Sequence, residues 1–201
     1  MRQLLVAGGR SAAGAPLRST EIRDLATDTW FRVASLGSPR ASHAAVLLAN
    51  GAVLALGGVP ATASAELYDP HSASWRPTAS LTAPMSAPIA TLLVDGSVLA
   101  IGEGRAERFD PARGAWTAFT ASFVPTDGHT STLLPDGRVL VAGGTKGGSL
   151  VAGAQVYDAA LQVWSVTGQM AVARRSHAAT LLRSGRVLVS GGEDLAGNAI
   201  A

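Results

Sequence analysis

The chain has 201 residues, of which 47% are hydrophobic, and a formal net charge of +2. This composition excludes a disordered chain, and without any run of about 18 apolar residues no helix is expected to span a membrane. No basic cluster is longer than Arg174-Arg175, which argues against nucleic-acid binding, and the absence of cysteine excludes disulfides, thiolate metal sites and a cysteine nucleophile.

The first predicted element is a short strand at residues 4–7, followed by Gly8-Gly9. The opening segment imitates a secretion signal, because it has one arginine, an apolar stretch and small residues. However, residues 4–9 match residues 139–144 later in the chain. We therefore interpret this segment as part of a repeat and not as a signal peptide.

A fixed spacing runs along the whole chain. Each of four tryptophans is followed 27 residues later by a glycine: Trp30 by Gly57, Trp75 by Gly102, Trp116 by Gly143 and Trp164 by Gly191. Four such coincidences indicate an array of one supersecondary unit, whose glycine sites are 41 to 49 residues apart.

The repeated unit consists of four short predicted strands. The turn between the first two strands is Asn50-Gly51, Asp95-Gly96, Asp136-Gly137 or Ser184-Gly185, and Asn-Gly or Asp-Gly between apolar runs is a strong hairpin signal. The second strand is apolar on consecutive residues, which indicates that both of its faces are covered. A third strand ends in an acidic–apolar–aromatic–Asp pattern, as at residues 66–69, and the tryptophan lies on the fourth strand.

Units of four strands predict blades that pack radially as a β-propeller. The expected fold is all-β, with four-stranded antiparallel blades, about four of which are present as an incomplete propeller segment. Alternatives are a compact four-bladed ring with a redundant strand and a ring completed by two chains. Incomplete terminal blades would expose apolar faces and favour self-association. The single domain 1–201 divides into a partial blade 1–37, blades 38–80, 81–121 and 122–169, and a partial blade 170–201.

The chain resembles the kelch-repeat family. The resemblance rests on the four tryptophans and on Gly8-Gly9, Gly57-Gly58, Gly143-Gly144, Gly191-Gly192, Tyr68-Asp69 and Tyr157-Asp158. Residues 40–43 and 174–177 look like the bacterial form, in which Arg-x-x-His opens the first strand. The third copy departs from the pattern, because Glu103 follows Gly102 and Pro88 replaces the histidine. The resemblance implies a kelch-type propeller and, for a full-length relative, an extracellular or cell-surface location.

Candidate binding residues lie in the connections of uneven length. From the glycine site to the Asp of the third strand there are 16, 12, 8 and 15 residues, whereas the hairpins at the opposite end are nearly constant. Variable loops on a rigid scaffold usually carry binding. Arg40 and Arg174 are expected to point toward the central channel. The full set of candidates is Arg10, Arg40, Arg105, Asp127, Lys146, Arg174, Arg175, Glu193 and Asp194.

Three histidines, His43, His129 and His177, occupy one repeat position. A ring of imidazoles can bind a metal or an anion. A residue repeated in successive copies is more typical of a structural contact between blades, so we expect no metal and no cofactor.

These features predict a non-catalytic interaction module whose loops bind a protein or a glycan, with arginines that favour acidic partners. Some propellers of this kind are copper radical oxidases, but their tyrosine–cysteine crosslink cannot form here because the chain has no cysteine. The alternatives are a carbohydrate-active or isomerising enzyme built on a propeller, and a structural segment of a larger surface protein.

Overall fold

The computed structural model describes residues 3–119 and 125–200. Within these ranges every regular element is a β-strand, and all the sheets are antiparallel with two to four strands. The described residues contain no helix that is long and apolar enough to cross a membrane. The chain divides into two compact units, Met1–Pro88 and Ile89–Ala201.

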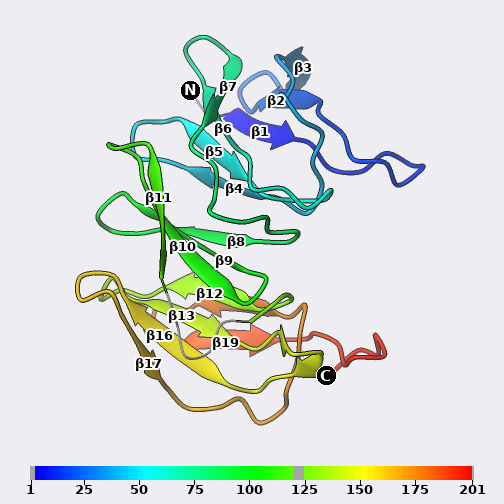
Figure 1. Cartoon of the computed structure of the whole chain (residues 1–201). Coiled ribbons are helices and arrows are strands. Elements are labelled where there is room, and N and C mark those ends of the chain that lie inside the picture. The colour runs from blue at the N-terminus through cyan, green and yellow to red at the C-terminus, as the bar shows by residue number, and fades with distance from the viewer. Residues whose placement is uncertain (1–2, 120–124, 201) are drawn as a thin grey trace. The chain divides into compact units, whose positions relative to one another are not determined.

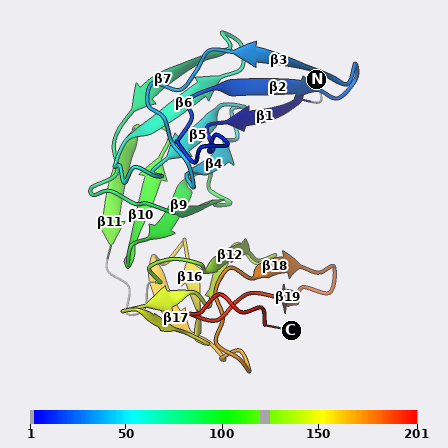
Figure 2. The ribbon, with the colours of Figure 1, turned by 90° about the vertical axis from the view of Figure 1, so that its right-hand side faces the viewer.

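The first unit contains two facing sheets (Figures 1 and 2). One consists, in order, of β1 (Gln3–Ala7), β2 (Thr20–Asp24) and β3 (Thr29–Val33). The other consists of β4 (Ala44–Leu47), β5 (Val53–Leu56), β6 (Ala65–Asp69) and β7 (Ser74–Thr78). A side-chain hydrogen bond of 3.0 Å from Trp75 Nε1 to Thr20 Oγ1 joins the two sheets.

The second unit contains two four-stranded sheets and two smaller ones. The first large sheet has β8 (Ile89–Leu92), β9 (Val98–Gly102), β10 (Arg105–Asp110) and β11 (Ala115–Phe119). The second has β12 (Thr130–Leu133), β13 (Val139–Ala142), β16 (Ala154–Asp158) and β17 (Val163–Val166). The small sheets pair β18 (Ala178–Leu181) with β19 (Val187–Ser190), and β14 (Thr145–Lys146) with β15 (Ser149–Leu150).

The core of the second unit lies between its two large sheets. Leu99 and Ile101 of β9 and Ala106 of β10 pack with Val139 and Val141 of β13 in one buried cluster. This cluster uses one face of β9 and one face of β13. The other face of β9 is buried as well, because Val98 and Ala100 are 0% exposed. Both faces of this strand are therefore covered, as its continuous apolar run predicts.

The tryptophan spacing corresponds to one cross-strand contact. In three sheets the ring centroids of the paired aromatic residues are 5.0 to 5.2 Å apart, for Tyr68 and Trp75, Phe109 and Trp116, and Tyr157 and Trp164. In the first sheet Arg23 stands opposite Trp30, with its guanidinium carbon 5.9 Å from the ring centroid. A cation–π contact there replaces the aromatic pair.

One backbone hydrogen bond recurs where the end of a second strand meets the segment that leads to the next first strand. The N–H of the residue after the glycine site donates to a carbonyl there, at 2.8 to 2.9 Å, from Gly9 to Arg40, Gly58 to Met85, Glu103 to Thr126 and Gly144 to Arg174. The bond therefore persists where Glu103 replaces the second glycine. In that copy β9 runs through Gly102, and Glu103-Gly104, both with positive φ, form the turn to β10.

The first glycine has little space around it in three of the four diglycines, at Gly8, Gly57 and Gly143. Gly143 has φ 64°, and a Cβ built on it would lie 2.7 Å from the carbonyl oxygen of Arg174 and 2.6 Å from the imidazole of His177. Gly57 meets a similar restriction from the carbonyl oxygen of Met85, at 2.7 Å. Gly191 has the same backbone conformation, with φ 63°, but no described atom lies within 4 Å of its Cβ position.

This contrast separates the conformational cost of losing a glycine from the steric cost. Both Gly143→Ala and Gly191→Ala force alanine to adopt a positive φ, but only Gly143→Ala also introduces a clash with backbone. We expect Gly143→Ala to lower the free energy of unfolding by at least about 2 kcal/mol more than Gly191→Ala. Urea unfolding of both variants measures the difference, and equal losses would contradict the close packing at Gly143.

Candidate functional site

In each unit, the loops that follow the second strands and those that precede the first strands meet at one end of its sheets. We call this end of a unit its diglycine rim. The rim of the first unit consists of residues 8–19, 34–43, 57–64 and 79–88, and the rim of the second unit consists of residues 102–105, 125–129, 143–153, 167–177 and 191–200. Paired backbone hydrogen bonds join the two kinds of loop within a sheet, at 2.7 and 3.0 Å between Ala41 and Val59 and at 2.9 and 3.2 Å between Arg175 and Glu193.

The second unit brings several of the predicted site residues together on this rim. Arg175 Nε lies 3.2 Å from Glu193 Oε1, which also accepts a hydrogen bond from Ser176 Oγ at 3.2 Å. Asp127 is exposed and its Oδ1 accepts a hydrogen bond from Thr145 Oγ1, also at 3.2 Å. The rim of the second unit therefore carries both an arginine and carboxylate groups.

Asp194 has a structural role in the loop that follows β19. Its Oδ1 accepts hydrogen bonds from the backbone N–H groups of Ala196 and Asn198, at 2.8 and 2.9 Å, and its Oδ2 accepts one from Asn198 Nδ2. The hydrogen bond from the Asn198 side chain is the largest cause, and that from its backbone N–H the next, that hold the pKa of Asp194 below its usual value. The carboxylate thus closes its own turn.

Three further predicted cations lie at the rims, Arg10 in the first unit and Arg105 and Lys146 in the second. Arg10 is exposed, and its Nη1 donates a 2.9 Å hydrogen bond to the carbonyl of Gly14 within the first loop. Arg105 is half-buried at the start of β10. Lys146 is exposed in the short hairpin β14–β15, which the sequence pattern does not predict.

Arg40 requires a correction. It was expected to face a ligand, but its side chain is 0% exposed. Its guanidinium donates to the carbonyl of Gly57 at 2.9 Å, to Ser64 O at 3.2 Å and Oγ at 3.0 Å, and to Glu66 Oε1 at 2.7 Å. Glu66 also accepts hydrogen bonds from the backbone N–H groups of Gly37 and Ser38. Arg40 therefore ties the entry of β4 to β5 and β6 and is not available at the surface.

The histidines of the repeat are partly or wholly buried. His43 is half-buried, and its Cε1 atom would lie 2.9 Å from a Cβ on Gly8 of the facing sheet. His177 is 7% exposed, and its Nε2 lies 2.9 Å from Thr130 Oγ1 on β12. Burial is the main cause that lowers the pKa of each imidazole. The charge of a nearby arginine, Arg40 for His43 and Arg174 for His177, lowers it further. No group of three or more metal-ligating side chains occurs among the described residues.

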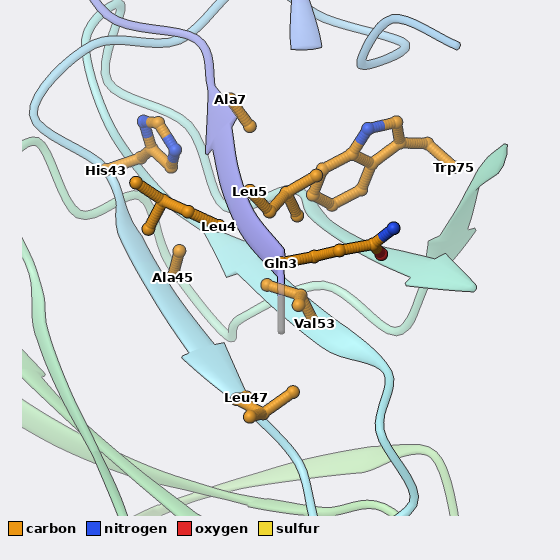
Figure 3. Close-up of a pocket in the computed structure, with 9 residues that line it drawn as sticks. All are labelled: Gln3, Leu4, Leu5, Ala7, His43, Ala45, Leu47, Val53 and Trp75. Atoms are coloured by element: carbon orange, nitrogen blue, oxygen red, sulfur yellow. The ribbon is translucent and has the colours of Figure 1, made fainter. Parts of the chain in front are cut away.

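In the first unit a groove lies between β1 and the strands β4 and β5 of the facing sheet (Figure 3). It has a volume of about 300 Å³ and is mainly apolar, with walls formed by Gln3, Leu4, Leu5, Ala7, His43, Ala45, Leu47, Val53 and Trp75. Leu47 is 63% exposed there, whereas its counterpart Leu133 in the second unit packs against a buried cluster. At the corresponding place in the second unit, β8 lies against β12, and Thr91 Oγ1 lies 2.6 Å from Ser131 Oγ.

This groove was not predicted from the sequence. Among the described strands β1 pairs only with β2, and the groove lies beside β1. The imidazole of His43, for which the sequence favours a structural contact between blades, forms part of the wall.

A solved structure of a protein named YjhT is similar to this chain, with a TM-score of 0.77 and 14% sequence identity. The match covers 98% of this chain and 76% of that chain. At this identity the likeness shows the fold alone. Comparisons with protein-family models and with curated proteins found no match.

The buried ion pair gives a prediction for stability. Arg40→Met leaves the Glu66 carboxylate, which is 8% exposed, without its counter-charge, so we expect a loss of about 3–5 kcal/mol in the free energy of unfolding. The control is Arg32→Met, because Glu21 occupies the Glu66 position in the first sheet and its partner Arg32 is 84% exposed. That change should cost below about 1 kcal/mol. Urea unfolding compares the two, and similar losses would refute a structural role for Arg40.

His129 gives a prediction for acid sensitivity. Its imidazole is 2% exposed, and burial lowers its pKa from 6.5 to about 4. Because the folded pKa lies below the unfolded one, the unfolded chain binds more protons between these values, and stability falls as the pH drops through this window. We expect this histidine to account for a loss of roughly 2–3 kcal/mol between about pH 7 and about pH 4.5.

Urea unfolding at both pH values tests this assignment. His129→Gln removes the titrating group and should reduce the pH dependence, whereas His71→Gln, at an exposed position, should leave it unchanged. If the His129 variant lost as much stability on acidification as the unchanged chain, the assignment would be wrong.

Proposed function

We propose that this chain is a segment of a kelch-type β-propeller and a non-catalytic interaction module. Support for the propeller arrangement comes from the repeat, from four-strand sheets with a common strand order and from the facing of successive sheets within each unit. Sheets of this kind give stability without assigning chemistry to any one copy, so the function lies in what differs between copies.

One observation carries the proposal: the diglycine rim combines a uniform backbone scaffold with connections of different length. The recurring N–H to carbonyl bond fixes where each variable loop leaves its second strand. In three sheets the N–H of the first glycine donates to the carbonyl directly before the third strand, from Gly8 to Ser19, Gly57 to Ser64 and Gly143 to Gly153, and this bond fixes where the loop re-enters the sheet. Between these fixed points the connection is a two-residue turn at Glu103-Gly104 but includes a hairpin of its own at Thr145–Leu150. Variable loops on fixed ends are the usual arrangement of a binding surface.

The side chains on the rims suit a carboxylate-rich partner, either an acidic protein or an acidic glycan. Arg10 on the rim of the first unit and Arg105 on the rim of the second can each donate directional hydrogen bonds to carboxylates. Acidic groups such as Glu193 and Asp127 lie on the same rim as Arg105, so a partner of the second unit would be recognised by matching positions and not by net charge. Arg40 takes no part in this surface, because it is buried.

A comparison of the two ends of one sheet tests the proposal. Arg105 lies at the rim end of β10, and Arg113 lies in the turn at the opposite end, with 83% of its side chain exposed. Biotinylated polyglutamate and polygalacturonate serve as carboxylate-rich probes. We expect Arg105→Ala or Arg10→Ala to weaken capture about threefold to tenfold, by loss of a charge-assisted hydrogen bond.

Arg113→Ala removes the same charge and should leave capture unchanged. Urea unfolding of each variant shows whether the fold is retained. Equal effects of Arg105→Ala and Arg113→Ala would indicate unspecific charge attraction, and the absence of capture of both probes would count against an acidic partner.

A further inference from the structure

The turn between β4 and β5 holds the only Asn-Gly pair of the chain, Asn50-Gly51. Two other turns at the same place of the repeat hold Asp95-Gly96 and Asp136-Gly137. Asn50 is exposed. Its counterpart Asp136 has 49% of its side chain exposed, although the first strand of that sheet, β12, lies against both β8 and β18. This position of the repeat is therefore open to water even where sheets pack on both sides.

The hydrogen bonds of the turn place the Asn50 amide beside the peptide group of the following glycine. The N–H of Ala52 donates to Asn50 Oδ1 at 3.1 Å, and the N–H of Gly51 donates to the carbonyl of Leu48 at 2.9 Å. Gly51 has φ 84°, which lies in the left-handed region that glycine adopts without strain. With no Cβ on residue 51, the approach of its nitrogen to the Asn50 side chain is not hindered.

This arrangement permits a reaction that needs only water. The Gly51 nitrogen loses its proton and forms a bond to Asn50 Cγ, the Cγ–Nδ2 bond breaks, and Nδ2 leaves as ammonia, so that a succinimide ring closes. Water then opens the ring in one of two ways. Attack at Cγ breaks the new bond and leaves an aspartate. Attack at the main-chain carbonyl carbon breaks the original peptide bond instead, and the chain then runs through Cγ as isoaspartate.

The folded turn slows this reaction without preventing it. Ring closure requires the Gly51 N–H to leave the carbonyl of Leu48 and Asn50 Oδ1 to leave the N–H of Ala52, so the turn has to open first. Residues 49–51 are all exposed, and exposed turns open at a low cost in free energy compared with the core strands. The reaction is therefore expected in the folded chain at a reduced rate.

We propose that Asn50 is a site of spontaneous deamidation, and that the fold accepts its aspartate product but not its isoaspartate product. Either product adds one carboxylate and lowers the formal net charge of +2 by one. The modified turn lies at the end of its sheet opposite the diglycine rim of the first unit.

The acceptance of aspartate follows from the other copies of the turn. Asp95 Oδ1 accepts a hydrogen bond from the N–H of Ser97 at 3.0 Å, and Asp136 Oδ1 accepts one from the N–H of Arg138 at 3.1 Å. These are the counterparts of the bond from Ala52 to Asn50. An aspartate at position 50 can therefore keep the turn unchanged.

Isoaspartate has no such precedent in the chain. It adds a methylene group to the main chain between β4 and β5 and moves the carboxylate from the side chain to the backbone. The bond from Gly51 to the carbonyl of Leu48 cannot keep its geometry with this extra atom, and the adjoining pair of Leu47 and Val53 is then no longer held in register. The isoaspartate form should have an open turn.

The test compares the folded chain with the chain denatured in guanidinium chloride, both kept in the same mildly alkaline buffer. Peptide mapping by mass spectrometry locates the converted residue, and methylation by an isoaspartyl methyltransferase measures isoaspartate. We expect Asn50 to convert in both samples, about tenfold to a hundredfold more slowly in the folded one, where each factor of ten corresponds to about 1.4 kcal/mol of turn opening.

Two variants and one internal control separate the turn from the rest of the chain. Asn50→Asp should unfold at the same urea concentration as the unchanged chain, and the isolated isoaspartate form should show faster hydrogen exchange at Gly51. Asp136→Asn puts the same residue pair into a second turn of this kind and should create a second site with a similar rate. Asn198 precedes Ala199, whose Cβ hinders ring closure, and should stay unconverted.

Several outcomes would overturn the proposal. One is a folded chain that still has an intact Asn50 after about a hundred times the period that converts the denatured chain. Others are equal rates in the two samples, faster conversion at Asn198 than at Asn50, no conversion in the Asp136→Asn turn, or a loss of stability in Asn50→Asp. Because the site lies away from the rim, none of these results bears on polyacid binding.

Discussion

The hydrogen bond from the second residue of each glycine site to the segment that opens the next first strand sets the spacing of the whole repeat. It recurs four times at 2.8 to 2.9 Å, although the number of residues between donor and acceptor changes from one copy to the next. A backbone bond depends on no particular side chain, which explains why Glu103 can stand in the donor position. The glycine before the donor is constrained more strongly, since a Cβ at Gly57 or Gly143 would collide with the acceptor carbonyl.

The same geometry decides which polar residues are structural. Because the segment that opens the first strand is held against the glycine site, the side chain of Arg40 is buried beside the end of β5 and the start of β6. There it donates hydrogen bonds to the carbonyl of Gly57 and to the carboxylate of Glu66. A buried charge without a partner would be very costly, so the pair has to be complete. The equivalent Arg174 is tolerated half-exposed because water can still solvate the part of it that lacks a carboxylate.

Sequence reasoning could predict the strands, because glycine turns, continuous apolar runs and the tryptophan spacing all have local physical causes. It could also place most of the variable connections at one end. It could not distinguish Arg40 from Arg174, since both open a first strand in the same motif. Their difference depends on whether a third strand with an acidic residue lies beside them, which is a tertiary property. The hairpin β14–β15 was missed because Thr145–Leu150 contains Gly147-Gly148 but lacks apolar alternation.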